Sequence, residues 1–530
     1  MQVERVPLSA TGQAPQIVLD YLSGKEGLRD YYAFTPDPSN FPAVVQEKRK
    51  QSLDRALLVQ VLIEQYEQVQ TSNAVQENIA ALSDANTFTV VAAHQPLLFL
   101  GPLYFVHKAA SAIKAARIAE EQLPGCRVVP VFWMGSEDHD FEELGHANVF
   151  GKRIQWDETP GGPVGRMDCG SIESALAEYD TITGSGDIAG ELKQLFRSAY
   201  GWGRTFAQAT RMVLDHLFGE HGLIVMDGDD ARLKRQFTDV MRAEFTKRTS
   251  SQIAGKTISR LSRDYDIQAQ PRDINLFYMV DGLRERIEFD KSEGVFSVVN
   301  SNVVFDEGTI INELKEHPDR FSPNVILRGL FQETVLPNLA FIGGPAEISY
   351  WLELKSLFEH FKVAFPMLIF RDIMIWIDSN TSSKMEKVGM KTEQLFVNED
   401  ELIAKMVKAS SHNELSLREE VERLRALFRR IVQKAKAVDP TLVNSVGAEE
   451  QKAVNALMNL ESKMLRAEKR HSETLVTQIR TIRSRLFPNG VLHERFDNFS
   501  NIYLREGQEM IGKLVDASDP FDGMVKALRS

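Results

Sequence analysis

The sequence has little cysteine and no long uninterrupted hydrophobic run. Cys126 and Cys169 are the only cysteines in 530 residues, which excludes a disulfide scaffold and indicates a reducing compartment. The first fifteen residues lack a basic segment followed by an apolar one, so we expect no secretory signal. The most apolar stretch, 90–106, is too short and too often interrupted by polar residues to span a bilayer. We therefore expect a soluble, cytoplasmic protein with no membrane partner.

Several familiar catalytic motifs are also missing. Gly145–Lys152 has the wrong spacing for a phosphate-binding P-loop, and Gly184–Gly190 follows no clear strand, as a dinucleotide fingerprint would. No nucleophile elbow, CxxC or HExxH pattern occurs. The net charge of −12 argues against a general nucleic-acid coat, so we expect no nucleic-acid partner.

Length and composition indicate a globular protein of more than one domain. Hydrophobic residues make up 43% and charged residues 26% of the chain, which is ordinary for a globular protein. Single cores stop growing near about 250–300 residues, so two or three domains are expected. We predict a core over 1–381 with insertions near 145–200 and 266–320, a helical arm over 382–487, and a helical tail over 488–530 that packs on the core.

The core shows the alternation of strands and helices that defines an α/β fold. Thr87–Ala93 and Val128–Met134 are short apolar runs rich in β-branched residues, and an alanine-rich helix over Leu103–Gln122 separates them. A helix at Phe206–Phe218 and a strand at Gly222–Met226 repeat the pattern. We therefore predict a parallel sheet covered by helices on both faces.

The insertions have a different character from this parallel core. Leu276–Val280 and Leu283–Phe289 are strand-like runs joined by Asp281-Gly282, a strong signal for a hairpin. We expect both insertions to be antiparallel. The core then resumes with a helix over Ile348–Phe361 and a strand over Val363–Phe370.

The arm carries apolar residues at coiled-coil spacing. One seam begins at Leu417, and a second runs from Ala453 to Leu486 with a break in the heptad around His471. Two such helices joined by a short loop predict an antiparallel hairpin that packs on itself or on a second copy. Residues 417–436 and 452–485 carry +4 and +5, which leaves −21 on the rest of the chain. The basic charge fits solvated coiled-coil faces, and attraction to phosphate is the alternative.

Polar residues follow the first predicted strand. His94 and Gln95 come directly after it, Gly101 precedes the next helix, and Tyr104, His107 and Lys108 lie in its first turns. Ligands of open α/β sheets bind beyond the carboxyl ends of the strands. Free amide groups at the helix start and the charge of Lys108 predict a carboxylate or phosphate site. In the alternative interpretation these side chains only cap the strand and helix ends.

The second strand ends in four consecutive ionisable residues, Glu137, Asp138, His139 and Asp140. The carboxylates are candidate ligands for an amine, for ribose hydroxyls or for Mg²⁺, although their spacing matches no zinc motif. His139 is a candidate general base that a neighbouring carboxylate orients. A solvated turn with a helix cap is the alternative.

Two further clusters lie downstream. The first contains Arg328. In the second, the turn Gly343-Gly344 opens a helix that carries Glu347 and Tyr350, and Arg371 follows the last core strand. Glycines at a helix start allow a ligand to approach the backbone closely, and arginines form forked contacts with carboxylate or phosphate.

These segments together resemble the BshC family of bacillithiol biosynthesis. The resemblance covers nearly the whole chain and rests on GPLYFVHK (101–108), PVFWMGSEDHDFEEL (130–144), SPNVILRGLFQE (322–333), FIGGPAEISYW (341–351) and FPNGVLHER (487–495). Two positions depart from the family pattern: His94 stands where glutamine is expected, and Gly329 where proline is expected.

The resemblance implies a Rossmann-like core with connecting insertions and a coiled-coil arm that forms a homodimer. It also implies a ligase that joins cysteine to the glucosamine amine of malyl-glucosamine, giving bacillithiol in the last step of its biosynthesis. Since amide formation from a free carboxylate is uphill in water, we expect ATP to activate cysteine, with Mg²⁺ as a candidate cofactor. The alternatives are a dimeric nucleotide- or sugar-binding scaffold and a metal-dependent hydrolase.

Overall fold

The computed structural model describes residues 2–159, 161–411 and 413–529. They divide into two compact units: residues up to Trp376 together with Leu492–Leu528, and Ile377–Val491 together with Arg529. The chain therefore leaves the first unit, builds the second, and returns to the first. The four BshC-like segments at 101–108, 130–144, 322–333 and 341–351 all lie in the first unit.

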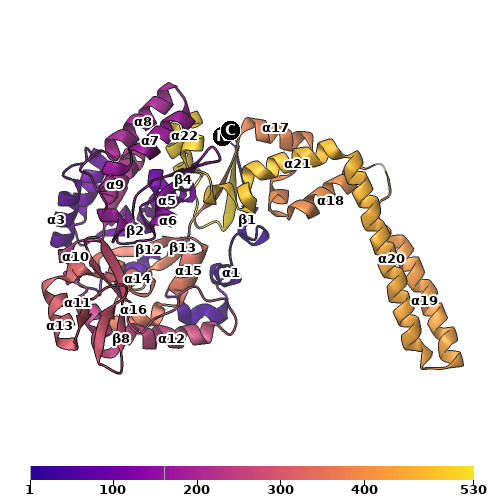
Figure 1. The fold of residues 1–530 in the computed structure, drawn as a ribbon, viewed down its shortest axis with the longest axis horizontal. Coiled ribbons are helices and arrows are strands. Elements are labelled where there is room, and N and C mark those ends of the chain that lie inside the picture. The colour runs from indigo at the N-terminus through magenta and orange to yellow at the C-terminus, as the bar shows by residue number, and fades with distance from the viewer. Residues whose placement is uncertain (1, 160, 412, 530) are drawn as a thin grey trace. The chain divides into compact units, whose positions relative to one another are not determined.

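A five-stranded parallel sheet lies at the centre of the first unit (Figure 1). Its strand order is β13, β12, β2, β3, β6, and every neighbouring pair is parallel. The strands are β13 (Met367–Phe370), β12 (Asn338–Gly343), β2 (Thr87–His94), β3 (Arg127–Met134) and β6 (Ile224–Asp227). The α/β fold class predicted from the sequence is confirmed.

Helix α5 (Tyr104–Glu121) joins β2 to β3 and packs against both strands. Its buried face contains Ala109, Ala112 and Ala116, whose small side chains let the helix lie close to the sheet. The predicted strand–helix–strand unit is thus confirmed. The strands pair from Thr87 with Arg127 through His94 with Met134, so both polar clusters emerge at the same edge of the sheet.

Two boundaries predicted farther along the core are wrong. The helix expected over Ile348–Phe361 is two helices, α15 (Pro345–Leu352) and α16 (Lys355–Phe361), and the following strand starts at Met367 rather than Val363. The break lies at Glu353, whose buried carboxylate accepts hydrogen bonds from the backbone N–H groups of Gln268 and Ala269. A long-range contact of this kind leaves no local signal.

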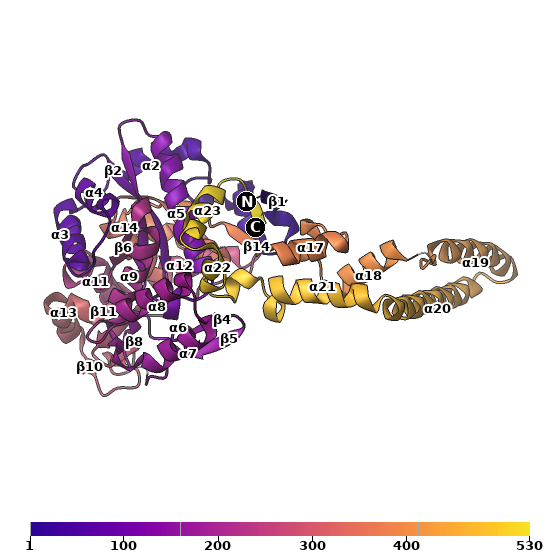
Figure 2. The same cartoon turned by 90° about the horizontal axis from the view of Figure 1, so that it is seen from above.

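The remaining helices of the first unit cover the sheets and the insertions (Figures 1 and 2). They are α1 (Gln16–Leu22), α2 (Phe41–Lys48), α3 (Arg55–Tyr66), α4 (Asn73–Ala81), α6 (Phe141–Leu144), α7 (Glu173–Thr183), α8 (Asp187–Ala199), α9 (Phe206–Phe218), α10 (Ala231–Arg235), α11 (Thr238–Lys247), α12 (Thr249–Leu261), α13 (Glu307–Glu316) and α14 (Val325–Val335).

The second insertion forms an antiparallel sheet of order β10, β9, β8, β7, β11. Its strands are β7 (Leu276–Val280), β8 (Leu283–Asp290), β9 (Val295–Val298), β10 (Val304–Phe305) and β11 (Phe321–Pro323). The predicted hairpin is confirmed, and Gly282 supplies the positive φ of its turn. In the first insertion β4 (His146–Val149) and β5 (Lys152–Gln155) are antiparallel, but helices α7 and α8 follow them.

A third sheet, of order β1, β15, β14, brings the two ends of the chain together. It consists of β1 (Gln2–Pro7), β15 (Met524–Arg529) and β14 (Ile373–Ile377). The tail contains the expected helices α22 (Ser500–Glu506) and α23 (Glu509–Ala517), but the prediction of a wholly helical tail is wrong for its last residues. They form the central strand of this sheet.

The second unit is helical, as predicted for the arm. It contains α17 (Ser379–Lys387), α18 (Glu399–Ser410), α19 (Arg418–Val438), α20 (Leu442–His471) and α21 (Glu473–Leu486). Helices α19 and α20 lie side by side with a three-residue connection at 439–441 (Figures 1 and 2), which confirms the hairpin. The heptad break coincides with the end of α20 at His471. Within the described part of the chain, we find no helix with the length and apolar character needed to cross a membrane.

Candidate active site

A cavity of about 730 Å³ lies beyond the carboxyl ends of the central strands. Of the residues predicted from the sequence, the following line it: His94, Gln95, Tyr104, Lys108, Asp138, His139, Arg328, Gly344, Glu347, Tyr350 and Arg371. These residues come from five separate stretches of the chain. Most of the site residues predicted from the sequence therefore lie together at one edge of the sheet.

Asp138 lies among cationic and amide groups in this cavity. Its Oδ2 accepts a hydrogen bond from Gln95 Nε2 at 2.9 Å, and its Oδ1 accepts one from the His139 backbone N–H at 2.8 Å. Arg284 and Arg328 place guanidinium nitrogens 3.9 and 3.7 Å from the carboxylate. Burial alone would raise the pKa of Asp138, but the two arginines and the hydrogen bonds hold that pKa far below its usual range. Asp138 is an anion at all ordinary pH values.

His139 receives a hydrogen bond from an arginine, which fixes its tautomer. Arg284 Nη1 lies 2.6 Å from His139 Nδ1, and a guanidinium only donates. Nδ1 is therefore an acceptor, and the proton of the neutral ring sits on Nε2. Burial and the charge of Arg284 lower the pKa of His139. In this arrangement His139 presents an N–H donor rather than the free lone pair that a general base requires.

His94 and Tyr104 form a hydrogen-bonded pair. His94 Nδ1 donates to the backbone carbonyl of Gln95 at 3.1 Å, which leaves Nε2 to accept from the Tyr104 hydroxyl at 3.0 Å. Burial, helped by the nearby charge of Lys108, lowers the pKa of His94 to about 3. His94 is thus a neutral acceptor that orients Tyr104. The ring of Tyr104 also packs against the Arg371 guanidinium, 5.3 Å from centroid to Cζ.

Lys108 is committed to a partner inside the protein. Its Nζ lies 2.5 Å from Glu347 Oε2 and donates to the Ala93 carbonyl at 2.8 Å. Its side chain is almost fully buried, and burial lowers its pKa. The same Glu347 oxygen accepts a hydrogen bond from the Gly344 N–H at 2.8 Å, which caps the start of α15. The charge predicted to hold a ligand is therefore largely balanced by Glu347.

Two of the predicted binding residues are buried and pair with side chains outside the cavity lining. His107 is fully buried, and its Nδ1 lies 2.9 Å from Glu494 Oε2. Glu137 lies 2.5 Å from Lys234 Nζ, a buried ammonium that also contacts Asp229 at 2.8 Å. Neither residue lines the cavity. Both side chains pair with other residues inside the protein. A high density of charged residues in the sequence therefore did not indicate contact with a ligand.

Three other predicted residues act through local backbone structure. Gly101 has φ +56°, and a Cβ there would lie 2.5 Å from Leu97 Cδ1, so the turn requires glycine. Asp140 caps α6 by accepting from the Glu143 N–H at 3.3 Å. Gly343 ends β12 and accepts from the Arg371 N–H at 2.9 Å. None of the three lines the cavity, so the cap proposed as the alternative for Asp140 matches the geometry.

Arg371 is held in the cavity wall by a residue from the C-terminal segment. Its Nη2 and Nη1 lie 2.6 and 3.1 Å from the two carboxylate oxygens of Glu494. Burial alone would raise the pKa of Glu494, but Arg371 and His107 hold it well below the usual range. Glu494 is thus a buried anion that fixes Arg371 in a forked geometry.

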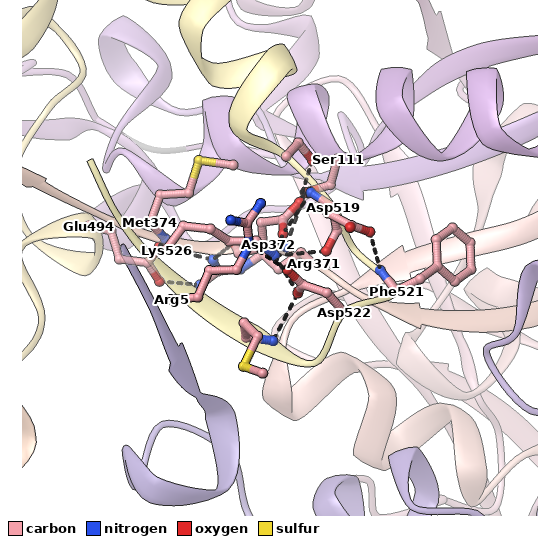
Figure 3. Close-up of polar contacts among 12 residues, drawn as sticks. Arg5, Ser111, Arg371, Asp372, Met374, Glu494, Asp519, Phe521, Asp522 and Lys526 are labelled. Atoms are coloured by element: carbon pink, nitrogen blue, oxygen red, sulfur yellow. Dashed lines mark hydrogen bonds and ion pairs between the residues drawn. The ribbon is translucent and has the colours of Figure 1, made fainter. Parts of the chain in front are cut away.

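The next residue, Asp372, is held from the opposite end of the same segment (Figure 3). Its carboxylate contacts Lys526 and Ser518 and accepts from Ser111 Oγ at 3.0 Å. Lys526 also contacts Asp522 at 2.7 Å, and the Lys526 side chain is 1% exposed. The turn between β13 and β14 is therefore clamped on both sides by residues that follow position 491.

The sequence did not single out four arginines that line the cavity: Arg272, Arg284, Arg286 and Arg495. Arg284 stacks on Phe277, 3.9 Å from Cζ to the ring centroid. Arg284 and Arg286 alternate along β8, in the sequence LRERIEFD, and that alternation toward one face is the signal available in hindsight. Among the described residues, seven cationic side chains and two carboxylates line the cavity, which suits an anionic ligand.

The carboxylates predicted as Mg²⁺ ligands do not converge. Glu137 pairs with Lys234, Asp138 faces two arginines, and Asp140 caps a helix. A search of the described part of the chain finds no group of three or more His, Cys, Asp or Glu residues arranged to hold a metal ion. These side chains therefore do not form a metal centre of the protein's own.

The chain matches known proteins over nearly its whole length. Residues 1–372 match the N-terminal Rossmann-like domain of bacillithiol biosynthesis BshC, and residues 374–529 match its C-terminal coiled-coil domain. The chain is 36% identical to a Flavobacterium johnsoniae protein (98% of both chains), 37% to one from Flavobacterium psychrophilum (98% of both) and 38% to one from Christiangramia forsetii (97% of this chain, 96% of the relative). Each relative is named "Putative cysteine ligase BshC". Together with the Rossmann-like sheet and the coiled-coil hairpin, these matches show that the chain belongs to the BshC family.

Proposed function

We propose that this protein is the ligase that joins L-cysteine to the glucosamine amine of malyl-glucosamine and so completes bacillithiol. The observation that carries the proposal is the single cavity in which the family motifs meet. Membership of a family whose relatives are named as cysteine ligases supports the reaction class. The cavity's excess of positive charge supports the choice of a substrate that bears carboxylates.

The arginines are the groups that would hold the malyl carboxylates. Arg284 and Arg328 flank Asp138, and Arg272 and Arg286 line the same cavity. Guanidinium groups bind carboxylates through paired N–H donors. Asp138 would hold Arg284 and Arg328 in position before the substrate binds. The substrate would then meet donors that are already aligned. His139, with its proton on Nε2, adds a further donor on this side.

Activation of cysteine is the energetic requirement of the reaction. A free carboxylate and an amine do not form an amide spontaneously in water, so we propose that ATP converts the cysteine carboxylate into an acyl phosphate or acyl adenylate. The cationic lining suits the phosphate groups. Any Mg²⁺ would arrive with the nucleotide, because the described carboxylates form no metal centre.

The arm supports a further proposal, that two copies of the chain associate. Several large apolar side chains are exposed on the α19–α20 hairpin, among them Leu427 at 50%, Met458 at 59% and Leu460 at 48%. Large apolar residues that stay exposed on a helical hairpin favour a helical partner. We propose a homodimer through this hairpin, and light scattering of the full chain tests it: a monomeric mass would contradict the proposal.

The ligase proposal is tested with purified full-length protein, cysteine, malyl-glucosamine and ATP. Mass spectrometry follows bacillithiol, and chromatography follows AMP and ADP. Formation of bacillithiol with stoichiometric nucleotide release is the expected result. Binding of the substrates without product would instead favour the scaffold function. Omission of each substrate in turn provides the controls.

A further inference from the structure

The two carboxylates that line the cavity differ in how many of their oxygens are already occupied. Both Asp138 oxygens accept hydrogen bonds, from Gln95 and from the His139 N–H, and two arginines face them. Glu347 uses one oxygen, Oε2, for both Lys108 Nζ and the Gly344 N–H. Within residues 2–159, 161–411 and 413–529, no hydrogen bond to Glu347 Oε1 is found.

Glu347 is also accessible from the cavity. Its side chain is 22% exposed, whereas its partner Lys108 is 3% exposed, and Glu347 is part of the cavity lining. The second oxygen of a carboxylate whose first oxygen is held by two donors has a fixed position. Such a preorganised acceptor, in a cavity whose charged residues are mostly cationic, is the place where a positively charged or hydrogen-bond-donating group of a ligand would be stabilised.

We propose that Glu347 Oε1 binds the amino group of the acceptor substrate and takes its proton as the amide forms. This inference rests on the proposed function, because it assigns a residue to that reaction. The amine would lie at Glu347 while the carboxylates of the same molecule lie at the arginines. Because one end of the substrate would bind Glu347 and the other end the arginines, the substrate would be held in one orientation.

The chemical step balances with the activated cysteine named above. The nitrogen lone pair of the acceptor attacks the cysteinyl carbonyl carbon and forms the C–N bond. The bond from that carbon to the phosphate oxygen breaks, and the phosphate or AMP leaves with the electron pair. The proton lost by the nitrogen passes to Glu347 Oε1. Lys108, held by the Ala93 carbonyl, remains hydrogen-bonded to Oε2 throughout.

This assignment differs from the base predicted from the sequence. His139 was the candidate, but Arg284 occupies its Nδ1 and the ring proton lies on Nε2. Asp138 is stabilised as an anion by Arg284 and Arg328, which makes it a weak proton acceptor. Glu347 is the carboxylate in the described lining that keeps an oxygen available to a ligand.

A purely structural role for Glu347 is the alternative, since it caps α15 and pairs with Lys108. Glu347→Gln separates the two roles: its amide oxygen still accepts from the Gly344 N–H, while the negative charge is lost. Glu347→Asp retains the charge with a shorter reach. The matched control is Glu359→Gln, which removes an exposed carboxylate that pairs with Lys355 at 2.6 Å on α16 and does not line the cavity.

Binding is measured by calorimetry without ATP, using malyl-glucosamine and the analogue in which a hydroxyl replaces the amine. The wild type is expected to prefer the amine by roughly 10- to 100-fold, the contribution of a hydrogen bond to a charged group. Glu347→Gln should abolish that preference and leave the affinity for the hydroxyl analogue nearly unchanged. Glu359→Gln should behave as wild type. An undiminished preference in Glu347→Gln would overturn the proposal.

Turnover provides the second measurement. If the ligase forms bacillithiol, Glu347→Gln should lower kcat by about 10²-fold or more, with partial recovery in Glu347→Asp. A full rate in Glu347→Gln would overturn the proton-acceptor role while the ligase proposal stands. If no product forms in the wild type, the ligase proposal fails, but the loss of amine preference in Glu347→Gln would still establish Glu347 as the amine site.

Discussion

Two clusters of charged residues lie on either side of the Arg371-Asp372 turn, and they are built differently. On the cavity side, seven cationic side chains meet two carboxylates among the described residues, and several of the cations retain access to the cavity. Behind the turn, Lys526 and Asp372 are paired and buried at 1% and 0% exposure. The buried charges are thus neutralised inside the protein, whereas charges that line the cavity remain accessible to a ligand.

The largest expected effect concerns the buried side. Lys526→Met leaves the Asp372 carboxylate buried without its cation, which should lower the free energy of unfolding by about 3–5 kcal/mol. Urea unfolding of the full chain measures the change. Lys50→Met is the control, because Lys50 pairs with Glu47 on the surface at 69% and 52% exposure, and its loss should cost below about 1 kcal/mol. Similar losses in the two variants would contradict the distinction.

Glu494 connects the two clusters. It is itself buried, and it holds Arg371, a residue of the cavity wall. Glu494→Gln leaves Arg371 buried with a weaker partner, so we expect a loss of about 2–4 kcal/mol in unfolding free energy. Affinity for malyl-glucosamine should fall as well, because Arg371 loses its fixed orientation. Calorimetry and urea unfolding check both expectations. Full stability with full affinity would show that Glu494 does not position Arg371.

Arg328 belongs to the open side, where its side chain is 28% exposed. Arg328→Met should weaken binding of malyl-glucosamine roughly 10- to 100-fold, because one charged donor is lost, while stability changes little. Arg242→Met is the control, since Arg242 forms an exposed surface pair with Asp239. The prediction fails if Arg328→Met unfolds more easily but binds the substrate as tightly as the wild type.

His94 gives a smaller, pH-dependent effect. Burial lowers its pKa in the folded state to about 3, whereas an unfolded histidine has a pKa near 6.5. Below pH 6.5 the unfolded chain gains a proton that the native His94 does not, so stability falls as the pH falls. His94→Gln removes this proton uptake and should lose about 1–2 kcal/mol less stability than wild type between pH 7 and 5. Urea unfolding at the two pH values checks the difference; equal losses would mean that His94 is protonated in the native state.

Local patterns predicted the elements of the fold well. The apolar runs at Thr87–Ala93 and Val128–Met134 match β2 and β3 almost to the residue, and Asp281-Gly282 does form a hairpin turn. These signals arise within a few residues of sequence. Strand β15 was missed because it contains the buried Lys526, a residue that a local pattern assigns to the surface.

The site was only partly predictable for the same reason. The strand ends directed attention to His94, Asp138 and Arg371, since the carboxyl edge of a parallel sheet gathers them. The sequence did not distinguish Asp138, which lines the cavity, from its neighbour Glu137, which pairs with Lys234. Partners such as Glu494, which lies 387 positions from His107, leave no trace in local spacing.

Because the chain returns to its first unit only after residue 491, the parts of the site are synthesised at different times. Arg371 is synthesised well before Glu494, and at usual translation speeds the interval is about 6–25 s. During that interval the second unit is being made, and Arg371 and His107 have no carboxylate partner from residue 494. The cavity wall can therefore be completed only after synthesis has passed the arm.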